Sequence, residues 1–556
     1  MKKHLSFLYI MIIIANLMVA ETAYTQNSGW EWVRVFGGKG ADEIFSSCTD
    51  KNGDIYIAGY FQEEINMDGI ILKSKGDNDI LIAKFNNKGN LIWAKQAGGT
   101  YSENLVISEY AKRIKVDSDG NIIVAGCFMW EADFDKQMIR GPGNTDIFVA
   151  KYSSSGKLLW VNSYGSEQHD FLFDMDIDEH NNIFLTGNFT GQFKIDSLSN
   201  EFEGAEYEGP GTTPFIARLN AKGNLEWMRR DIGKADKTLI KVSKQKIYYA
   251  LEYSTDLLLK DAYHSVSGNS DFIVQCMNID GDIEWQRKFS SNHNESIESL
   301  DAGIDGSVLI SGKYGNIPEY KSNFNENQES DLCTYFSKLD FDGSVSWTAN
   351  NNSPPSIGGT NFSKLSEETY FSTDIYTIEV DVDGFRIVPD GEWYNSYVAL
   401  LDKYGKTREI LLTTPGIIKS VIPTKSHEYY VSGSILSSVN AFEQRNNNGG
   451  FIDFYIGLRK LPMTEIKNSN EQNNNFLDSK VTVFPNPASN TFTVTIDNQA
   501  LIERINITNH EGKLIHNFID CKIPFTMDIH DLASGTYYVT LVNQGIIISK
   551  KLVINN

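Results

Sequence analysis

The stretch DILIAKFNNKGNLIW, residues 79–93, decides the fold of this chain. Its Ile, Leu, Phe and Trp residues suit a pleated, half-buried surface, and the Asn-Lys-Gly segment between the two apolar runs suits a hairpin turn. The stretch therefore predicts two antiparallel strands. Two more runs of this kind, Ile114–Val116 and Ile122–Gly126, follow it and are joined by an Asp-Ser-Asp-Gly turn. Together the four runs predict a four-stranded sheet.

The same unit recurs along the chain. Its tryptophan recurs at Trp32, Trp93, Trp160, Trp227, Trp285 and Trp347. A seventh copy keeps the glycine of the turn, Gly405, but has Glu409 in place of the tryptophan. Repetition of short strands at a regular period predicts an all-β fold, a seven-bladed β-propeller with four-stranded blades. An aromatic residue at one repeat position fills the gap between twisted sheets, so we interpret the six tryptophans as packing residues.

The two ends of the repeat array are offset. The array opens with a single tryptophan-type strand, Trp30–Phe36, and closes with a single strand over Phe451–Leu461. One blade would then be built from both ends of the chain, which joins the first blade to the last and leaves no open edge. We therefore expect a closed ring over residues 27–461.

The repeated phrases resemble the seven-bladed β-propeller (SBBP) repeats of secreted bacterial proteins, over residues 30–461. The resemblance implies the fold but no particular activity, because propellers host many unrelated functions. In the fourth and sixth copies, Lys244-Gln245-Lys246 and Ser366-Glu367-Glu368 replace the usual turn, so the sequence leaves the boundaries of those two blades open.

The chain begins with a segment that is typical of a signal peptide. Lys2 and Lys3 precede an apolar run, Leu5–Ala20, that is short for a membrane span. We expect a signal peptide over residues 1–23, with cleavage after either Ala20 or Ala23, and no transmembrane span. The protein would then be secreted or attached to the outer-membrane surface. The formal net charge of −22 has the wrong sign for a nucleic-acid partner.

The composition changes after Leu461. Residues 462–480 are polar and include a run of asparagines, so we expect a flexible linker. Residues 481–556 return to strand-like alternation, as in Val481–Phe484 and Phe492–Ile496. This pattern predicts a small C-terminal β-sandwich of the Ig-like kind.

Four motifs occur in order along this C-terminal segment. They are Phe484-Pro-Asn-Pro-Ala488, Asn509-His-Glu-Gly-Lys513, Asp531-Leu-Ala-Ser-Gly-Thr-Tyr537 and Lys550-Lys-Leu-Val-Ile554. In this order they resemble the type A C-terminal sorting domain of Bacteroidetes type IX secretion cargo. The residues that match are Pro485, Asn486, Pro487, Gly512, Asp531, Leu532, Gly535, Tyr537, Lys550 and Lys551. The resemblance implies the type IX secretion machinery as a partner, and a tail that is usually removed after export.

Aromatic residues outside the repeat register are the candidate ligand-binding residues. Trp130 follows a strand, and Trp393 lies next to Tyr394 in a turn-rich segment with nearby acids. Exposed aromatics beside acids are typical of sugar-binding surfaces, and local packing is the alternative. The ligand would be a surface glycan or a protein.

No catalytic signature is found in the sequence. It has no His-Glu-x-x-His pair, no Gly-x-Ser-x-Gly elbow and no phosphate-binding glycine loop, so we predict no catalytic residue, metal site or cofactor. The turns Asp117–Gly120, Asp340–Gly343 and Asp381–Gly384 suggest calcium, but they lack the further oxygens that calcium needs and are interpreted as hairpin turns. A non-catalytic binding, adhesion or scaffold module is favoured. An extracellular enzyme acting on polysaccharide or peptide is the alternative.

Overall fold

The structure is a computed structural model, and it describes residues 30–99, 109–195, 202–203, 213–259, 262–303, 305–314, 333–351, 361–366, 369–376, 380–382, 385–387, 394–424, 428–436, 452–460, 481–496, 501–509, 514–530, 532–543 and 546–555. The regular secondary structure of these residues consists of strands alone, so the all-β prediction is confirmed. Contacts divide the chain into two units between Lys460 and Leu461. The expected signal peptide, 1–23, and the expected linker, 462–480, lie outside the described residues.

The larger unit is built from four-stranded antiparallel meanders, called blades here. Seven of them can be followed through the described residues, and they are numbered 1 to 7 along the ring. Their innermost strands are β2 (Glu43–Thr49), β6 (Tyr110–Val116), β12 (Phe171–Ile177), β18 (Ala235–Ser243), β24 (Ser296–Ala302), β28 (Asn361–Lys364) and β34 (Ile417–Pro423). Their second strands are β3 (Ile55–Met67), β7 (Ile122–Phe128), β13 (Ile183–Phe189), β19 (Lys246–Tyr253), β25 (Val308–Tyr314), β29 (Thr369–Tyr376) and β35 (Glu428–Leu436).

The third and fourth strands complete each blade. The third strands are β4 (Ile70–Phe85), β10 (Asp146–Tyr152), β16 (Thr213–Leu219), β22 (Asp271–Asn278), β26 (Cys333–Leu339), β32 (Asn395–Asp402) and β36 (Ile452–Lys460). The outermost strands are β5 (Leu91–Gly98), β11 (Leu158–Gly165), β17 (Leu225–Arg230), β23 (Ile283–Phe289), β27 (Val345–Asn351), β33 (Thr407–Pro415) and β1 (Trp30–Phe36). The prediction that the four runs between residues 79 and 126 form one sheet is wrong. The first two runs belong to β4 and β5 of blade 1 and the last two to β6 and β7 of blade 2, because the chain crosses to the next blade between β5 and β6.

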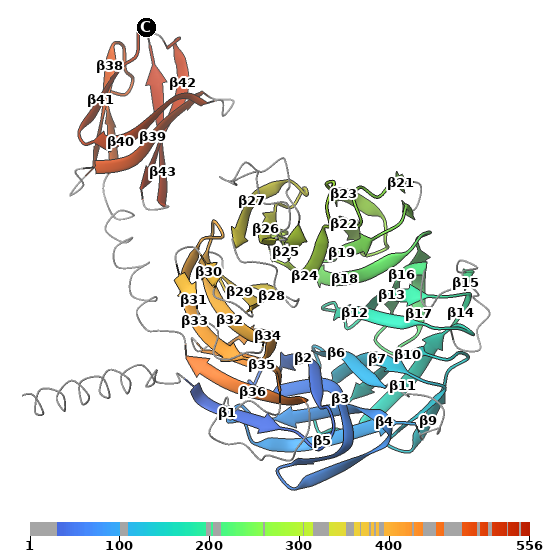
Figure 1. Cartoon of the computed structure of the whole chain (residues 1–556). Helices are drawn as coiled ribbons and strands as arrows, with labels where there is room; N and C mark the ends of the chain where they lie inside the picture. Colours follow the sequence, from blue (N-terminus) through green and yellow to red (C-terminus); the bar gives the residue numbers. More distant parts are fainter. Residues whose placement is uncertain are drawn as a thin grey trace, which may run out of the picture. The chain divides into compact units, whose positions relative to one another are not determined.

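The innermost strands form a closed circle. Each contacts the next in the order β2, β6, β12, β18, β24, β28 and β34, and β34 contacts β2 again. The blades radiate from this circle (Figure 1). The larger unit is therefore a β-propeller. The second and third strands carry its core, because neighbouring blades cover both of their faces, and β7 and β10 are buried along their whole length.

Blade 7 is closed by both ends of the unit, as predicted. Its first three strands are β34, β35 and β36, and its fourth strand is β1. β1 pairs antiparallel with β36, from Trp30 opposite Arg459 to Phe36 opposite Phe454. Since β1 comes from the start of the unit and β36 from its end, this pairing ties the last blade to the first.

The repeat tryptophans pack on glycines of the next blade, which confirms their interpretation as packing residues. A Cβ on Gly89 would lie 2.6 Å from the Trp32 ring, and Trp32 Nε1 donates to the Asn87 carbonyl at 3.2 Å. The same arrangement joins Trp32 to Gly89, Trp93 to Gly156, Trp160 to Gly223, Trp227 to Gly281, Trp285 to Gly343 and Trp347 to Gly405. All six glycines have φ between +78° and +87°, so the turn itself also favours glycine.

The seventh copy lacks its tryptophan for a structural reason. Glu409 lies on β33, the outer strand of blade 6, and would face the connection between the third and fourth strands of blade 7. Blade 7 has no such turn, because its fourth strand is β1 from the other end of the unit. A tryptophan at position 409 would therefore have no glycine turn to cover.

The two faces of the ring differ in their connections. In an antiparallel meander, the 1–2 and 3–4 connections leave from one face, and the 2–3 and 4–1 connections leave from the other. The first face, called the turn face, has tight turns such as 50–54 and 86–90, where Gly53 and Gly89 donate back to the carbonyls of Asp50 and Asn86. The second face, called the loop face, has longer connections such as 129–145, between β7 and β10.

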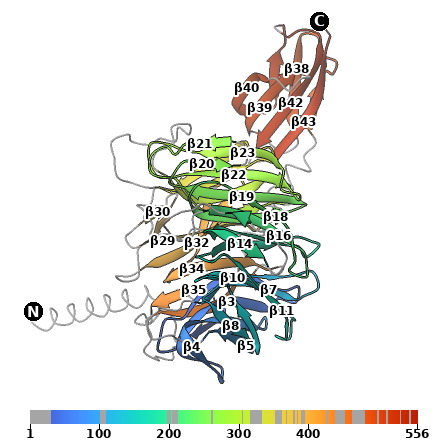
Figure 2. The ribbon, with the colours of Figure 1, turned by 90° about the vertical axis from the view of Figure 1, so that its right-hand side faces the viewer.

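Hairpins inserted on the loop face reach the preceding blade. β8 (Glu131–Phe134) and β9 (Gln137–Arg140) come from blade 2 but extend the sheet of blade 1, because β8 pairs with β5 (Figure 2). β14 (Gln192–Ile195) and β15 (Phe202–Glu203) extend blade 2 through β11 in the same way. The hairpins β20 (Leu257–Leu259) with β21 (Ala262–His264) and β30 (Val380–Val382) with β31 (Phe385–Ile387) form separate two-stranded sheets. Added strands cover edges that would otherwise expose unpaired backbone groups.

The smaller unit consists of two antiparallel sheets with a shared apolar core. One sheet has the order β37 (Val481–Phe484), β38 (Thr491–Ile496) and β41 (Phe525–Asp528). The other has the order β40 (Leu514–Lys522), β39 (Leu501–Asn509), β42 (Gly535–Asn543) and β43 (Ile546–Ile554). Phe492 and Val494 of the first sheet and Ile505 and Val539 of the second belong to one buried cluster. The Ig-like comparison stays a prediction.

Candidate functional site

Charged side chains of the innermost strands pair with the next strand around the circle. Arg113 and Lys115 of β6 bind Asp174 and Asp176 of β12, at 2.5 and 2.8 Å. Further ion pairs join other innermost strands to each other. The other ion pairs are Glu43 with Lys419 at 2.7 Å, Lys237 with Glu298 at 2.5 Å and Lys241 with Asp301 at 2.9 Å.

These ion pairs keep the carboxylates of the innermost strands charged. Burial alone would raise the pKa of Asp176, but the nearby Lys115 and Lys241 outweigh burial and lower this pKa. The charge of Asp301 raises the pKa of Lys241. A general acid needs a pKa near the working pH, so Asp176 is poorly suited to that role.

Pairs of buried carboxyl groups lie between blades on the loop face. In each pair, one acid lies on a third strand, near its start in Asp146, Asp271 and Asp453 and within β4 in Asp79. The other acid immediately precedes the first strand of the next blade. The four pairs are Asp79 with Glu109, Asp146 with Asp170, Asp271 with Glu295, and Asp453 with Asp42. All eight side chains are at most 5% exposed.

The same backbone geometry holds the second acid of each pair. A backbone N–H of the 4–1 connection donates to its carboxylate: Gly99 to Glu109 at 2.9 Å, Ser166 to Asp170 at 2.5 Å and Ser291 to Glu295 at 2.9 Å. Gly38 donates to Asp42 in the same way. A repeated donor at four junctions shows that these carboxyl groups belong to the construction of the ring.

In two of the pairs, a glycine lies between the two acids. A Cβ on Gly98 would lie 2.6 Å from both the Asp79 and the Glu109 carboxyl groups. A Cβ on Gly165 would lie 2.0 Å from Asp146 Oδ1 and 2.9 Å from Asp170 Oδ2. The two carboxyl groups of a pair therefore converge on one glycine.

Burial and mutual repulsion raise the pKa values of these acids. Burial raises the pKa of Asp146 to about 8, and the charge of Asp170 adds to it. Burial likewise raises the pKa of Asp170 to about 7 and that of Glu109 to about 8, with Asp79 adding to the latter. Two buried carboxyl groups that converge on one glycine favour keeping a proton between them over ionising together.

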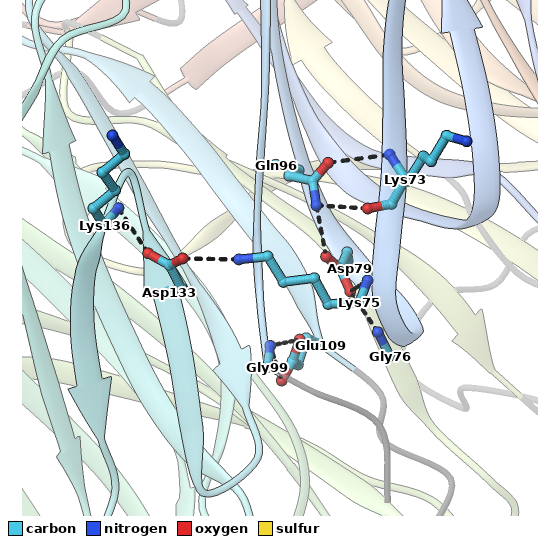
Figure 3. Close-up of polar contacts among 9 residues, drawn as sticks. All are labelled: Lys73, Lys75, Gly76, Asp79, Gln96, Gly99, Glu109, Asp133 and Lys136. Carbon is cyan, nitrogen blue, oxygen red and sulfur yellow. Dashed lines mark hydrogen bonds and ion pairs between the residues drawn. The ribbon is translucent and has the colours of Figure 1, made fainter.

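The Asp79 pair is drawn in Figure 3. Asp79 accepts from the backbone N–H groups of Lys75 and Gly76 at 3.0 and 3.2 Å and from the Gln96 amide at 3.2 Å. The Lys75 ammonium points away from it to Asp133 of β8, at 2.9 Å (Figure 3). Burial raises the pKa of Asp79 to about 6, less than that of Asp146, since these donors favour the charged form.

The sequence reasoning did not find the carboxyl pairs. A usable signal was present, because an aspartate opens an otherwise apolar strand phrase at Asp79, Asp146 and Asp271. A second acid follows the outer strand four residues after a serine, as in Ser166 to Asp170 and Ser291 to Glu295. Their contact depends on the closure of one blade against the next, which strand patterns alone do not give.

The structure places the candidate ligand-binding residues on different blades. Trp130 is 37% exposed and lies on the loop face, before the β8–β9 hairpin of blade 2. Its Nε1 donates to Asn144 Oδ1 at 3.4 Å, and its carbonyl accepts from Gly141 N at 2.8 Å. Tyr394 is half-buried in the 2–3 connection of blade 6, while Trp393 lies outside the described residues. Trp130 and Tyr394 are therefore not brought together.

The Asp-x-Asp-Gly turns lie in hairpins. Both oxygens of Asp117 have partners, with Oδ1 accepting from the N–H groups of Asp119 and Asn121 and Oδ2 lying 2.7 Å from Lys151 Nζ. Asp342 Oδ1 accepts from Ser344. The third turn, 381–384, is only partly described. Across the described ranges, no group of three or more His, Cys, Asp or Glu residues has the geometry of a metal site.

The Pro-Asn-Pro motif of the smaller unit is bound to the last strand. Asn486 Nδ2 donates to the Lys551 carbonyl at 2.7 Å, and Val553 N donates to Asn486 Oδ1 at 2.8 Å. Ala488 N donates to the Val553 carbonyl at 2.8 Å, so the chain after Pro487 continues along β43. Asn486 thus acts as a side-chain substitute for one rung of a strand pair.

The other motif residues are arranged around β42 and β43. Leu532 is buried in the shared core, and the Tyr537 hydroxyl donates to the Ala533 carbonyl at 3.1 Å. Gly535 is the first residue of β42. Lys550 and Lys551 are exposed on β43, and Gly512 and Asp531 lie outside the described residues. The motifs therefore combine core residues with an exposed basic pair.

Residues 482–555 match the family described as "Secretion system C-terminal sorting domain". The smaller unit is a secretion-system sorting domain. The sorting domain assigns the chain to type IX export, and hence to the extracellular space or the outer-membrane surface. Among the described residues, no helix has the length and apolar character to cross a bilayer.

The remaining comparisons are distant. The chain is 23% identical to an uncharacterized WD repeat-containing protein of Acanthamoeba polyphaga mimivirus, in a match covering 35% of this chain and 16% of that protein. The chain thus spans about a sixth of that relative's length. The Pan2 WD40 domain of Neurospora crassa (11% identity, 76% of this chain, 95% of that chain) and the hydrazine synthase of Kuenenia stuttgartiensis (10%, 70%, 93%) both align with a TM-score of 0.35. Because these TM-scores are low, the assignment of the larger unit as a propeller rests on the order of its strands and on the closed circle of its innermost strands.

Proposed function

We propose that the propeller is a non-catalytic ligand-binding, adhesion or scaffold module of the seven-bladed SBBP type, displayed or released outside the cell by its type A sorting domain. Its ligand is a surface glycan or a protein, bound on the loop face. Connections on a rigid scaffold are the usual place for recognition, because they vary in length without disturbing the core.

The exposed Trp130 on the loop face is the observation that carries this proposal. Its ring Nε1 donates to Asn144 Oδ1 at 3.4 Å, and its backbone carbonyl accepts from Gly141 N at 2.8 Å, so its ring and its backbone are both anchored to the segment 141–145. A large, rigid aromatic surface with one hydrogen-bonding edge is suited to sugar rings and to protein side chains. The Asp176 carboxylate in the circle, by contrast, is committed to Lys115.

Incubation of the exported protein with a panel of soluble and insoluble polysaccharides tests this proposal. Depletion of the protein by one polysaccharide, without new reducing ends, is the expected result. Trp130→Ala should lower that depletion at least about tenfold, the loss typical of a central aromatic contact. Phe341→Ala is the matched control, because Phe341 is 74% exposed and lies on the turn face.

Equal binding by wild type and Trp130→Ala would remove Trp130 from the binding surface. Binding lost in Phe341→Ala alone would move the site to the turn face. If no polysaccharide depletes the protein, the same two variants are compared for capture of surface proteins from a bacterium that uses type IX secretion, and equal capture would overturn the loop-face assignment.

An extracellular enzyme acting on polysaccharide or peptide is the second candidate. It is favoured by the converging carboxyl pairs, since two acids with separated pKa values are the usual equipment of glycoside hydrolysis. The pairs are at most 5% exposed, which leaves a substrate no access in this conformation. New reducing ends that disappear in Asp79→Asn would support this candidate over the binding module.

The sorting domain supplies its own test. We propose that the exposed Lys550 and Lys551 contact the secretion machinery, while Asn486 holds the last strand in place for that contact. Lys550→Ala with Lys551→Ala should retain the protein inside the cell envelope without unfolding it. Asn486→Ala should both retain and destabilise it, because two strand-like hydrogen bonds are lost.

A further inference from the structure

One of the carboxyl pairs is connected to Trp130 through the loop that follows the β8–β9 hairpin. Asp146 Oδ2 accepts from Gly143 N at 3.2 Å and lies 1.9 Å from the position of a Cβ on Gly141. Gly141 and Asn144 are the two residues that hold Trp130. The Asp146 carboxyl group therefore contacts the segment 141–145 directly, through Gly141 and Gly143.

The partner acid holds the same segment from the next blade. Asp170 N donates to the Thr145 carbonyl at 2.8 Å, and Asn144 N donates to the Gln168 carbonyl at 2.8 Å. Thr145 and His169 form a parallel bridge between the two connections. Movement of Asp170 away from Asp146 would therefore pull on the segment that positions Trp130.

The pair has a place for one proton. Asp146 Oδ1 is fully buried and has no hydrogen-bond partner, and it points to the same glycine, Gly165, as Asp170 Oδ2. Asp170 is already stabilised as a carboxylate by Ser166 N and Ser166 Oγ. A proton on Asp146 would remove the uncompensated charge from this buried carboxyl group and the repulsion between the two acids.

We propose that the Asp146–Asp170 pair is a proton-operated latch, which holds the segment 141–145 and Trp130 in place while the pair keeps at least one proton and releases them when the last proton is lost. The inference rests on the proposed binding role of Trp130 and gives its regulation. Binding on the loop face would then weaken as the medium turns from mildly acidic to mildly alkaline.

The range of pH in which the latch works follows from the two acids. Their folded-state pKa values of about 8 and about 7 lie above the ordinary carboxyl value near 4. The folded protein therefore holds more protons than the unfolded chain between these limits, and the free energy of unfolding falls as pH rises from about 4 to about 8. Release of the loop is expected at the upper end of that interval.

Few other titratable groups face the pair. Burial raises the pKa of the Cys127 thiol, so it stays neutral throughout this range. His169 Nδ1 lies 3.2 Å from the Thr145 hydroxyl and needs its own control. In the part of the chain that the structure describes, no lysine or arginine is among the groups that shift the pKa of Asp146 or Asp170.

The Asp271–Glu295 pair is a natural control within the same chain. Its backbone contacts repeat those of the Asp146 pair, with Glu295 N donating to the Ser270 carbonyl at 3.0 Å. Lys288 Nζ lies 2.9 Å from Asp271 Oδ2 and supplies the positive charge that the Asp146 pair lacks. Its segment 266–270 should therefore stay fixed over the same pH range.

Hydrogen exchange of the exported full-length protein at pH 6.0 and pH 8.5, corrected for intrinsic exchange rates, tests the latch. In the wild type, amides of 141–145 should exchange at least about fivefold faster at the higher pH, and those of 266–270 should not. Asp146→Asn should abolish the acceleration, since an amide carries no charge at any pH and the repulsion from Asp170 is then absent. Asp170→Asn serves the same purpose if Asp146→Asn does not fold. His169→Gln should leave the acceleration unchanged.

Three results would overturn the latch. They are an absence of acceleration in the wild type, an acceleration that survives Asp146→Asn or Asp170→Asn, and an acceleration that disappears in His169→Gln. Because the measurement needs no ligand, its failure leaves the binding proposal standing. Equal ligand binding by Trp130→Ala would in turn remove the binding role and leave the latch.

Discussion

The turn face and the loop face of the propeller are held together by different physics. On the turn face, every junction except the one between blades 6 and 7 is a tryptophan of one blade on a glycine turn of the next, as with Trp93 on Gly156. On the loop face, four junctions are pairs of buried acids, as with Asp146 and Asp170. Apolar contacts depend little on pH, whereas paired acids depend on a proton. One ring therefore has a face that is insensitive to pH and a face that responds to it.

This difference separates stability from function. The turn face repeats with little change around the ring, and its connections are short hydrogen-bonded turns. The loop face carries the inserted hairpins and Trp130, and it is joined by groups that are costly to bury. Costly polar groups are kept where they do something besides holding the fold, so the loop face is the better place to look for binding.

The largest expected effect is the loss of a turn-face tryptophan. Trp93→Ala removes a ring that is 8% exposed and packed on the turn of the next blade. It should lower the free energy of unfolding by about 3–5 kcal/mol, measured by guanidinium denaturation. Trp130→Ala on the loop face should change it by less than about 0.5 kcal/mol, and equal losses in the two variants would contradict the division between faces.

Adding one methyl group to each face gives the next largest effect. A Cβ on Gly165 would lie 2.0 Å from Asp146 Oδ1, so Gly165→Ala should cost about 2–3 kcal/mol. Gly120 on the turn face has open space but a φ of +80°, so Gly120→Ala should cost only the backbone strain of about 1 kcal/mol. If Gly120→Ala is the more costly of the two in thermal unfolding, the loop-face packing is wrongly described.

Replacing one acid of a pair by its neutral amide should raise the stability of the propeller at high pH and leave it unchanged at low pH. Burial and Asp79 raise the pKa of Glu109 to about 8, so at pH 8.5 both acids of this pair are largely charged. Glu109→Gln should raise the melting temperature by about 2 °C or more at pH 8.5 and leave it unchanged at pH 5. Asp119→Asn, at an exposed acid of the turn face, should change neither value. A gain of the same size at both pH values would contradict the shared proton.

The smallest expected effect is at the seventh repeat. Glu409→Trp restores the repeat sequence on β33, but blade 7 has no 3–4 turn for the ring to cover. The free energy of unfolding should stay within about 0.5 kcal/mol of the wild type. A gain above about 1 kcal/mol would mean that the missing tryptophan has another cause than the closure of the ring by β1.

The sequence predicts the parts of this molecule that depend on local patterns. Short strands, glycine turns and tryptophans recur in register in each sequence repeat of the larger unit. They therefore predict the propeller, its closure by β1 and β36, and the packing role of Trp93. Four motifs in order predict the sorting domain. The pair Asp146–Asp170 escapes such reasoning, because its two members belong to different blades and meet only in the closed ring. The fixation of Trp130 by Asn144 also depends on how a loop folds back.

The most direct measurement is the melting temperature of the exported protein as a function of pH. Acids with raised pKa values of about 6 to 8 at three junctions hold protons that the unfolded chain has lost. The account predicts that the melting temperature falls steadily as pH rises from about 5 to about 8. A melting temperature that stays constant or rises over this interval would contradict the claim that the loop face is held together by shared protons.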